Sequence, residues 1–219
     1  MRPLAFARVT LDTLVDLLVA NRLEILAVIT GIISVYLSTR ENIWSWPTAI
    51  VNVSLYFIVF YEAKLYADMG LQVVYFALSL YGWYEWLYGG ENRTELHVSR
   101  ASRSLGVRLA VLGVVSALLL GTALARFTDA SLPYIDSATT STSLVAQWMM
   151  TRKILESWAV WVAVDVVYIG MFFYKKLYLT MGLYAVFLVL AVMGYVQWKR
   201  SWKTRSLASP SWEPTAATS

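Results

Sequence analysis

A short stretch in the second half of the chain places two indoles and a carboxylate on one helical stripe. Trp158, Trp161 and Asp165 follow one another at spacings of three and four residues. Side chains at these spacings share one face of a helix. Each indole face offers stacking and cation–π attraction on the order of 0.5–2 kcal/mol, and the carboxylate offers charge neutralisation. The stripe therefore predicts a receptor for a flat cation.

Each of these residues also has a purely structural interpretation. Tryptophans near helix ends form the aromatic belts of membrane interfaces, and Trp158 lies near the start of its apolar stretch. Asp165 lies about mid-stretch, where an unpaired acid costs roughly 2.5–3.5 kcal/mol on insertion scales. A structural ion pair or hydrogen bond inside a helix bundle is therefore the alternative to a binding role for Asp165.

Other polar and aromatic residues complete the candidate binding set. In the first half, Trp44-Ser45-Trp46-Pro47 leads to Asn52, which approximately matches Asp165 if one residue is inserted. Asn52 and Tyr56 lie four residues apart and face the same way on a helix. Buried amides donate and accept hydrogen bonds at once, and bonding between helices is the alternative to a binding role for them. The candidate substrate-binding residues are Trp158, Trp161, Asp165, Gln147, Asn52, Tyr56, Trp46, Gln72 and Trp83.

The composition excludes a water-soluble globular protein. The 219 residues are 58% hydrophobic and 15% charged, against roughly 25% charged in soluble domains, and the mean hydropathy is +0.57. With no cysteine and one histidine, His97, in a polar stretch, we expect no metal site and no cofactor. We interpret the net charge of +4 as a topology signal and expect no nucleic-acid partner. The sequence has no P-loop, HExxH or GxSxG motif, so it predicts neither an ATP-driven motor nor an enzyme.

A block of the first half recurs in the second half. Residues 64–71 (KLYADMGL) reappear at 176–183 as KLYLTMGL, and the same register relates Gly82 to Gly194 and Trp86 to Trp198. Both copies lie between long apolar stretches. Membrane proteins built from such repeats are frequently transporters, with the substrate held between the two halves.

Seven apolar stretches approach the roughly 20 residues that a membrane helix needs. The predicted spans are 23–37, 46–61, 65–88, 105–125, 138–150, 155–174 and 177–198. The fifth span contains a run of hydroxyl residues at 139–143, which suits the bundle interior better than a lipid-facing surface. The predicted units are an interfacial helix at 1–21, a first three-helix repeat at 22–88, a loop and linker helix at 89–126, a second repeat at 127–200 and a disordered cytoplasmic tail at 201–219.

The distribution of basic residues favours one orientation. Eleven of the 18 lysines and arginines fall on one side of the predicted spans and seven on the other, so the positive-inside rule places the N-terminus outside and the C-terminus in the cytoplasm. One linker helix between two triplets makes the repeats parallel. By analogy with parallel-repeat transporters, we predict an all-α integral membrane protein with seven helices in a 3+1+3, SWEET-like arrangement.

Over residues 24–198 the chain resembles the PnuC family of bacterial vitamin transporters. The resemblance rests on Trp44-x-Trp46-Pro47, Asn52, residues 64–68, Leu71-Gln72, Gly82-Trp83-Tyr84-x-Trp86, residues 151–153 and Glu156-Ser157-Trp158-x-x-Trp161. It implies the same 3+1+3 fold, nicotinamide riboside as the substrate, and facilitated diffusion with trapping by cytoplasmic phosphorylation. It also implies assembly as a homotrimer.

The chain departs from the family pattern at two positions. Ser157 and Asp165 stand where the family usually has asparagine. An acid at position 165 keeps a cation site but alters which cation fits, and related family members are associated with thiamine, riboflavin or deoxynucleosides. We therefore predict an inner-membrane facilitator that binds a small cationic vitamin and alternates access without direct ATP use. Nicotinamide riboside is the first candidate substrate and thiamine the alternative; a non-transporting membrane receptor or subunit is the alternative class.

Overall fold

The computed structural model describes residues 22–64, 66–128 and 132–208, and these fold entirely as helices and connecting loops. The helices are α2 (Arg22–Thr39), α3 (Ser45–Glu62), α4 (Tyr66–Tyr88), the short 3₁₀ helix η1 (Glu91–Arg93), α5 (Arg103–Phe127), α6 (Pro133–Thr151), α7 (Glu156–Tyr174) and α8 (Tyr178–Ala208). The seven α-helices in this part of the chain confirm the all-α, seven-helix prediction. Four of them, α2, α5, α7 and α8, are long and apolar enough to span a membrane on their own composition.

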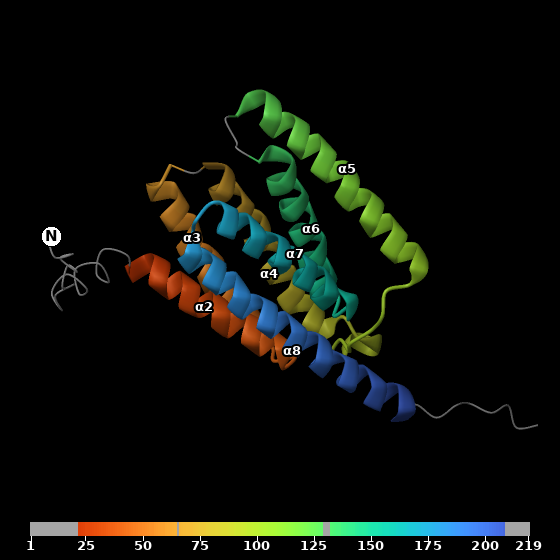
Figure 1. Cartoon of the computed structure of the whole chain (residues 1–219). Helices are drawn as coiled ribbons and strands as arrows, with labels where there is room; N and C mark the ends of the chain where they lie inside the picture. The colour runs from red at the N-terminus through yellow and green to blue at the C-terminus, as the bar shows by residue number, and fades with distance from the viewer. Residues whose placement is uncertain (1–21, 65, 129–131, 209–219) are drawn as a thin grey trace, which may run out of the picture.

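Two triplets of helices form the bundle. In the first, α3 packs against α2 and α4; in the second, α7 packs against α6 and α8. The triplets meet through α2 against α8 and through α4 against α6, while α5 packs along α6 at the outer edge (Figure 1). These two inter-triplet contacts are equivalent under the repeat, as parallel repeats around a two-fold axis require.

One constant offset of 112 residues relates the two triplets. Adding it to α2, α3 and α4 gives α6, α7 and α8 to within a residue at their starts. The turns match as well: Asn42 N–H donates to Leu37 O, and its equivalent Ile154 N–H donates to Met149 O, both at 3.0 Å. The inserted residue that the sequence analysis placed before Asn52 is therefore wrong. The buried Val53 is the equivalent of Asp165, and Asn52 is the equivalent of Val164.

The polar fifth span is a complete helix whose hydroxyls face inward. Pro133 lies in its first turn, where the missing N–H costs little. The buried residues of α6 include Ser137, Thr139, Ser141 and Ser143. The hydroxyl run thus lies in the bundle interior, as predicted. There Ser137 and Thr139 donate to carbonyls one turn earlier in α6 itself.

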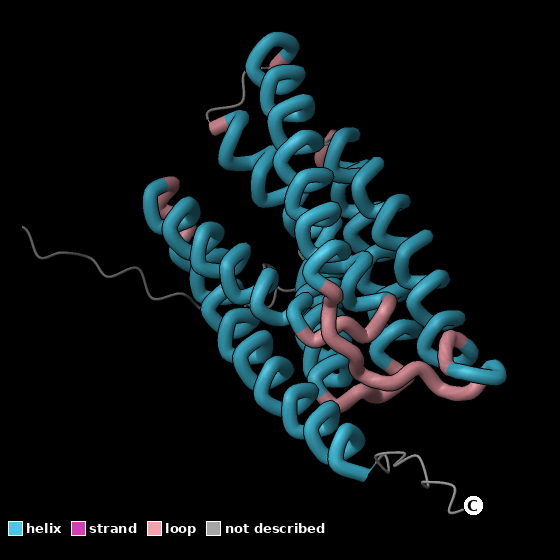
Figure 2. The backbone as a smooth tube through the Cα atoms, turned by 90° about the vertical axis from the view of Figure 1, so that its right-hand side faces the viewer, coloured by secondary structure: helices cyan, strands magenta, loops and turns pink. Residues whose placement is uncertain are grey.

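The loops gather at the ends of the helices, and the longest connection, between α4 and α5, crosses one end of the bundle (Figure 2). At this end Ser99 N–H donates to Lys153 O, and Leu155 N–H donates to Ser99 O. We call it the loop end. The predicted boundary at residue 200 is too early, because α8 continues to Ala208. The predicted helix at 1–21 and residues 209–219 of the predicted tail lie outside the described residues.

Candidate functional site

Four tryptophans form a buried cluster near the loop end, two from each repeat. Trp46 lies over Gly82 and meets Trp86 edge-on, with ring centroids 5.3 Å apart. Trp158 lies over Gly194 and meets Trp198 edge-on at 5.4 Å. A β-carbon on Gly82 would lie 2.3 Å from the Trp46 ring, and one on Gly194 would lie 2.5 Å from the Trp158 ring. Glycine is therefore needed at both positions for the ring to approach the helix.

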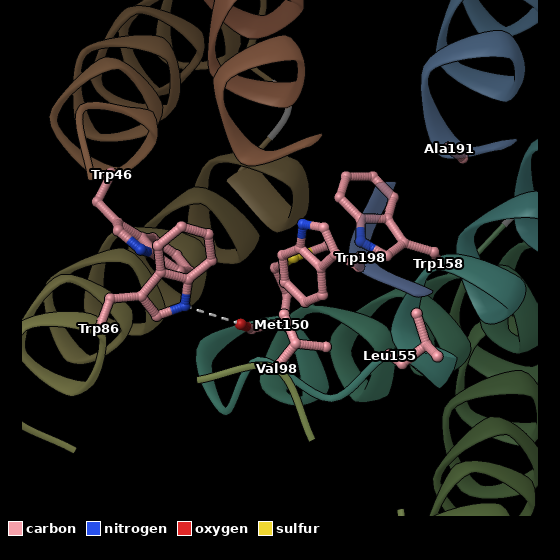
Figure 3. Packing of buried hydrophobic residues seen from close by; sticks show 8 residues of the cluster. All are labelled: Trp46, Trp86, Val98, Met150, Leu155, Trp158, Ala191 and Trp198. Carbon is pink, nitrogen blue, oxygen red and sulfur yellow. Dashed lines mark hydrogen bonds between the residues drawn. The ribbon is translucent and has the colours of Figure 1, made fainter. Parts of the chain in front are cut away.

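The two inner tryptophans of this cluster join the repeats. Trp86 and Trp198 lie 5.8 Å apart between ring centroids. The Trp86 indole donates to Met150 O at 3.1 Å, and the Trp198 indole donates to Ser38 O at 2.9 Å (the first bond is drawn in Figure 3). Each acceptor lies in the last turns of the other repeat's first helix, where carbonyls have no helical partner. The tryptophan cluster, Trp46, Trp86, Trp158 and Trp198, thus holds the two halves together.

This packing locates several predicted binding residues. Trp46 is 2% exposed and Trp158 is 1% exposed, and each has a ring face against a glycine. Trp161 and Trp83 are half-buried and pack against the tryptophan cluster. In the structure, Trp46 and Trp158 therefore build the core, while Trp161, one turn further along α7, lies at its border.

Asp165 lies at the middle of α7 and is 3% exposed. Its carboxylate lies near the phenols of Tyr168, one turn later on α7, and Tyr184 on α8. Tyr184 in turn lies near Tyr75 of α4 and Tyr56 of α3. Tyr184 therefore lies between the buried acid of the second triplet and two tyrosines of the first.

Stacked rings form a wall beside this acid. The Tyr184 ring lies 4.6 Å from Tyr168 and 5.2 Å from Phe172, measured between centroids, and Phe187 packs edge-on at 5.9 Å. Interplanar angles of 38° and 29° make the first two contacts tilted or stacked. Aromatic rings beside a buried acid are the groups that attract flat cations.

Hydroxyls from α6 face the same region. Thr139 and Ser143 lie beside the Tyr168 phenol, and Ser143 also lies beside Tyr75. The buried Ser143 hydroxyl has no well-formed hydrogen bond to any described residue. Buried polar groups are nearly always hydrogen-bonded, so this hydroxyl is available to a ligand or a water molecule.

The remaining predicted residues lie around this centre in different roles. The Asn52 amide nitrogen donates to Ala27 O at 2.5 Å and lies against Gly31, which is the interhelical bond considered as its alternative role. Tyr56 stacks on Phe60 with centroids 5.6 Å apart. Gln147 and Gln72 are half-buried on α6 and α4.

The sequence analysis missed the aromatic wall. Tyr168 lies three residues after Asp165, so the helical stripe could have been extended to include it. Tyr184 carried no such signal, because it lies on another helix and its repeat equivalent is Gln72. No group of three His, Cys, Asp or Glu side chains in the described part of the chain could hold a metal ion.

The family model described as nicotinamide mononucleotide transporter matches residues 21–200, nearly the whole of the bundle. The chain belongs to this family. It is therefore a multi-pass membrane protein of a transporter family, with a buried acid and an aromatic wall in its second repeat.

Relatives named for different substrates share about the same identity with this chain. The nicotinamide riboside transporter PnuC of Escherichia coli is 27% identical, covering 84% of this chain and 87% of its own. PnuC of Neisseria mucosa is 30% identical, covering 82% and 73%. The riboflavin/roseoflavin transporter RibM of Streptomyces davaonensis is 28% identical, covering 78% and 81%.

A solved structure supports the fold of this family member. The crystal structure of the vitamin B3 transporter PnuC matches with a TM-score of 0.68 at 24% identity, covering 87% of each chain. At this identity the likeness establishes the fold, and the SWEET-like arrangement predicted from the duplicated block agrees with it.

Proposed function

We propose that this protein carries nicotinamide riboside across the bacterial inner membrane by alternating access. The observation that carries the proposal is Asp165, a buried acid beside the aromatic wall that α7 and α8 form. Nicotinamide riboside joins a flat cationic ring to a neutral sugar, and each part has a matching group here. The names of the E. coli and N. mucosa relatives support the same substrate.

The side chains divide the recognition between ring and sugar. Tyr184 and Tyr168 lie along the pyridinium face, Trp161 approaches it from the loop-end side, and Asp165 offsets its positive charge. The ring contacts contribute about 0.5–2 kcal/mol each through stacking and cation–π attraction. The Ser143 hydroxyl and the Gln147 amide bind the ribose hydroxyls or the carboxamide, since both can donate and accept.

Transport then follows from movement of the two triplets around this centre. The tryptophan cluster joins the triplets at the loop end, so access to the midplane there requires these contacts to separate. The opposite opening requires movement at the other end of the bundle. Uptake needs no ATP in this scheme, and phosphorylation in the cytoplasm traps the vitamin after its release.

We further propose that the loop end faces the cytoplasm, in accordance with the excess of basic residues on that side. Because the chain has no cysteine, a single introduced cysteine reports on one position. Asn92→Cys in the exposed loop after α4 should react with a membrane-impermeant maleimide only in inside-out vesicles. Ala63→Cys, in the exposed turn between α3 and α4, should react only in right-side-out vesicles; the reverse pattern would invert the orientation.

Thiamine is the second candidate substrate, because it is also a flat aromatic cation that a buried acid would favour. Riboflavin, the substrate for which RibM is named, carries no positive charge and gains less from Asp165. Competition between labelled nicotinamide riboside and unlabelled thiamine or riboflavin measures this order directly.

Uptake by reconstituted protein tests the proposal. Proteoliposomes should accumulate labelled nicotinamide riboside to equilibrium without ATP, and the compound recovered inside should be chemically unchanged. Trp161→Ala should abolish uptake at normal expression, whereas Tyr178→Ala, which removes an exposed ring from α8, should leave it intact. Binding without uptake would indicate a receptor, recovery of an altered compound would indicate an enzyme, and normal uptake by Trp161→Ala would remove Trp161 from the site.

A further inference from the structure

A cavity lined by acids and indoles lies at the loop end, away from Asp165. Its volume is about 360 Å³. The lining comes from both repeats and from the connection between α4 and α5: Glu41, Asn42, Ile43, Trp44, Trp86, Leu87, Glu95 and Lys153. It therefore lies where the two triplets and the long loop meet.

A tethered cation already occupies part of this cavity. The Lys153 ammonium lies 4.4 Å from the centroid of the Trp86 ring and 3.6 Å from a Glu41 carboxylate oxygen. Lys153 is only 5% exposed. Burial lowers the pKa of Lys153, and the charges of Glu41 and Glu95 oppose that shift. The cavity thus holds one buried positive charge between an indole face and carboxylates.

The repeat places this ion pair between equivalent positions. Glu41 and Lys153 are 112 residues apart, both follow the first helix of their triplet, and both have left-handed backbone, with φ of 54° and 46°. Like charges at two equivalent positions facing across a two-fold axis would repel each other. Here the charges are opposite, so the pair is attractive and links one triplet to the other.

The remaining lining suits a free aromatic cation. Trp44 is 65% exposed and offers an uncovered indole face, while Trp86 offers the face on which Lys153 now lies. Glu41 and Glu95 both lie near Lys153, and the Arg205 guanidinium lies near it as well. Acid and ring faces are the same chemistry as at Asp165, repeated nearer to the membrane surface.

We propose that this loop-end cavity is a second binding site for the aromatic cation that the protein carries, and that Lys153 fills it as an internal cation until the substrate displaces it. The proposal rests on the proposed function, since it takes the substrate to be cationic and aromatic. Displacing Lys153 from Glu41 removes a contact between the triplets. Arrival of the substrate at this end therefore favours separation of the triplets and release.

Counting bound ligands tests the proposal on the full chain in detergent. Titration calorimetry with nicotinamide riboside should give one tight and one weak site per chain in the wild type, because Lys153 competes for the second. Lys153→Met should give two tight sites, and Lys153→Met with Glu41→Gln should again leave the second site weak. Lys153→Arg keeps the cation and should behave like the wild type.

The possible failures are distinguishable. No binding to the wild type would contradict the proposed function and not the second site. Only one tight site in a folded Lys153→Met protein, with a normal unfolding transition, would overturn the second site.

If Lys153→Met does not fold, an experiment on the wild type still tests whether the substrate displaces Lys153. Saturating nicotinamide riboside should raise the rate of Lys153 acetylation, read by mass spectrometry, at least tenfold while the exposed Lys64 stays constant. An unchanged Lys153 rate would overturn the proposal.

Discussion

The two repeats of this protein share one packing arrangement of tryptophans and glycines, which we call the frame, and they differ in the polar residues near the middle of their helices. In both, a tryptophan of the second helix lies over a glycine of the third helix and meets a second tryptophan edge-on, at 5.3 and 5.4 Å. The first repeat has Val53 where the second has Asp165, and Gln72 where the second has Tyr184. The fold needs the shared residues twice, whereas the acid and its ring partner occur once.

The polar groups inside the two repeats come from opposite helices. In the first repeat, the Asn52 amide of α3 covers Ala27 and Gly31 of α2 and bonds to Ala27 O. In the second, the equivalents of Ala27 and Gly31 are Thr139 and Ser143, and Val164 replaces the amide. The first repeat thus satisfies its polar group internally, and in the second Thr139 does the same within α6, while the buried Ser143 hydroxyl has no well-formed hydrogen bond to any described residue. This difference is why the proposed site draws most of its binding chemistry from the second repeat.

Giving the second repeat the residue of the first should have the largest effect. Asp165→Val removes the buried charge and should lower nicotinamide riboside uptake at least a hundredfold in proteoliposomes, because the pyridinium then has no counter-charge in a nonpolar site. Asp136→Asn on α6, a partly exposed acid 4.0 Å from Lys175, is the control and should transport normally. If Asp165→Val transports as well as the wild type, the acid that distinguishes the second repeat is not the basis of transport.

Substitution of the shared glycines should show that the frame matters equally in both repeats. Gly82→Ala and Gly194→Ala place a methyl group against a tryptophan ring, and overpacking of this kind costs about 1–3 kcal/mol. The melting temperature should fall in both variants. Gly70→Ala and Gly182→Ala are the matched pair, because nothing lies within 4 Å of their added β-carbons and alanine is the better helix former. If the melting temperature fell in only one of Gly82→Ala and Gly194→Ala, the packing of the two repeats would not be equivalent.

Removal of the crossed indole bonds should have a smaller effect. Trp86→Phe and Trp198→Phe each delete one hydrogen bond between the repeats, with a net contribution of about 0.5–1.5 kcal/mol. Their melting temperatures should fall by similar amounts, since the two bonds are equivalent at 3.1 and 2.9 Å. Trp202→Phe, a half-buried ring packed at the border of the cluster, is the control. If the melting temperature fell much more in one variant than in the other, one of the two tryptophans would contribute most of the stabilising contact between the triplets.

The smallest effect is expected at the surface of the loop end. Arg100 pairs with Glu156 at 2.9 Å, but its side chain is 58% exposed. Exposed ion pairs contribute about 0–1 kcal/mol, so Arg100→Ala should change the melting temperature little and uptake not at all. A loss comparable to that of Gly82→Ala would show that this pair stabilises the loop end far more than its exposure indicates.

The repeat and the helices could be predicted from the sequence, because the length of an apolar stretch and a repeated block are both local signals. The inward position of the hydroxyl run also followed from its polarity. The exact register did not, since the block alone fixes the third helix of each repeat and leaves Asn52 free to slip by one residue. Ser45-Trp46 and Ser157-Trp158 repeat at the same offset as the block and could have fixed the register. The contact of Trp46 with Gly82 gives the physical reason for that register, and this contact is visible only in three dimensions.

The site was predictable only in part for the same reason. Asp165 was found because an acid in an apolar stretch is conspicuous. Tyr184 and Tyr75 come from other helices, and tyrosines in membrane helices carry no marker that separates a binding wall from ordinary packing. Trp158 matched the expected stripe, but its ring lies over Gly194 in the core. Helical spacing identifies a face but does not tell which neighbour covers it.

The most direct test of the central claim compares a cationic ligand with its neutral form. Calorimetry should measure binding of nicotinamide riboside, thiamine and the uncharged reduced form of nicotinamide riboside to the wild type and to Asp165→Asn. We expect the wild type to bind nicotinamide riboside at least tenfold more tightly than the neutral form, a difference of about 1.4 kcal/mol, and Asp165→Asn to lose most of this preference. Equal preference in both proteins, or no binding of either vitamin, would contradict the assignment of Asp165 as the counter-charge of a transported cation.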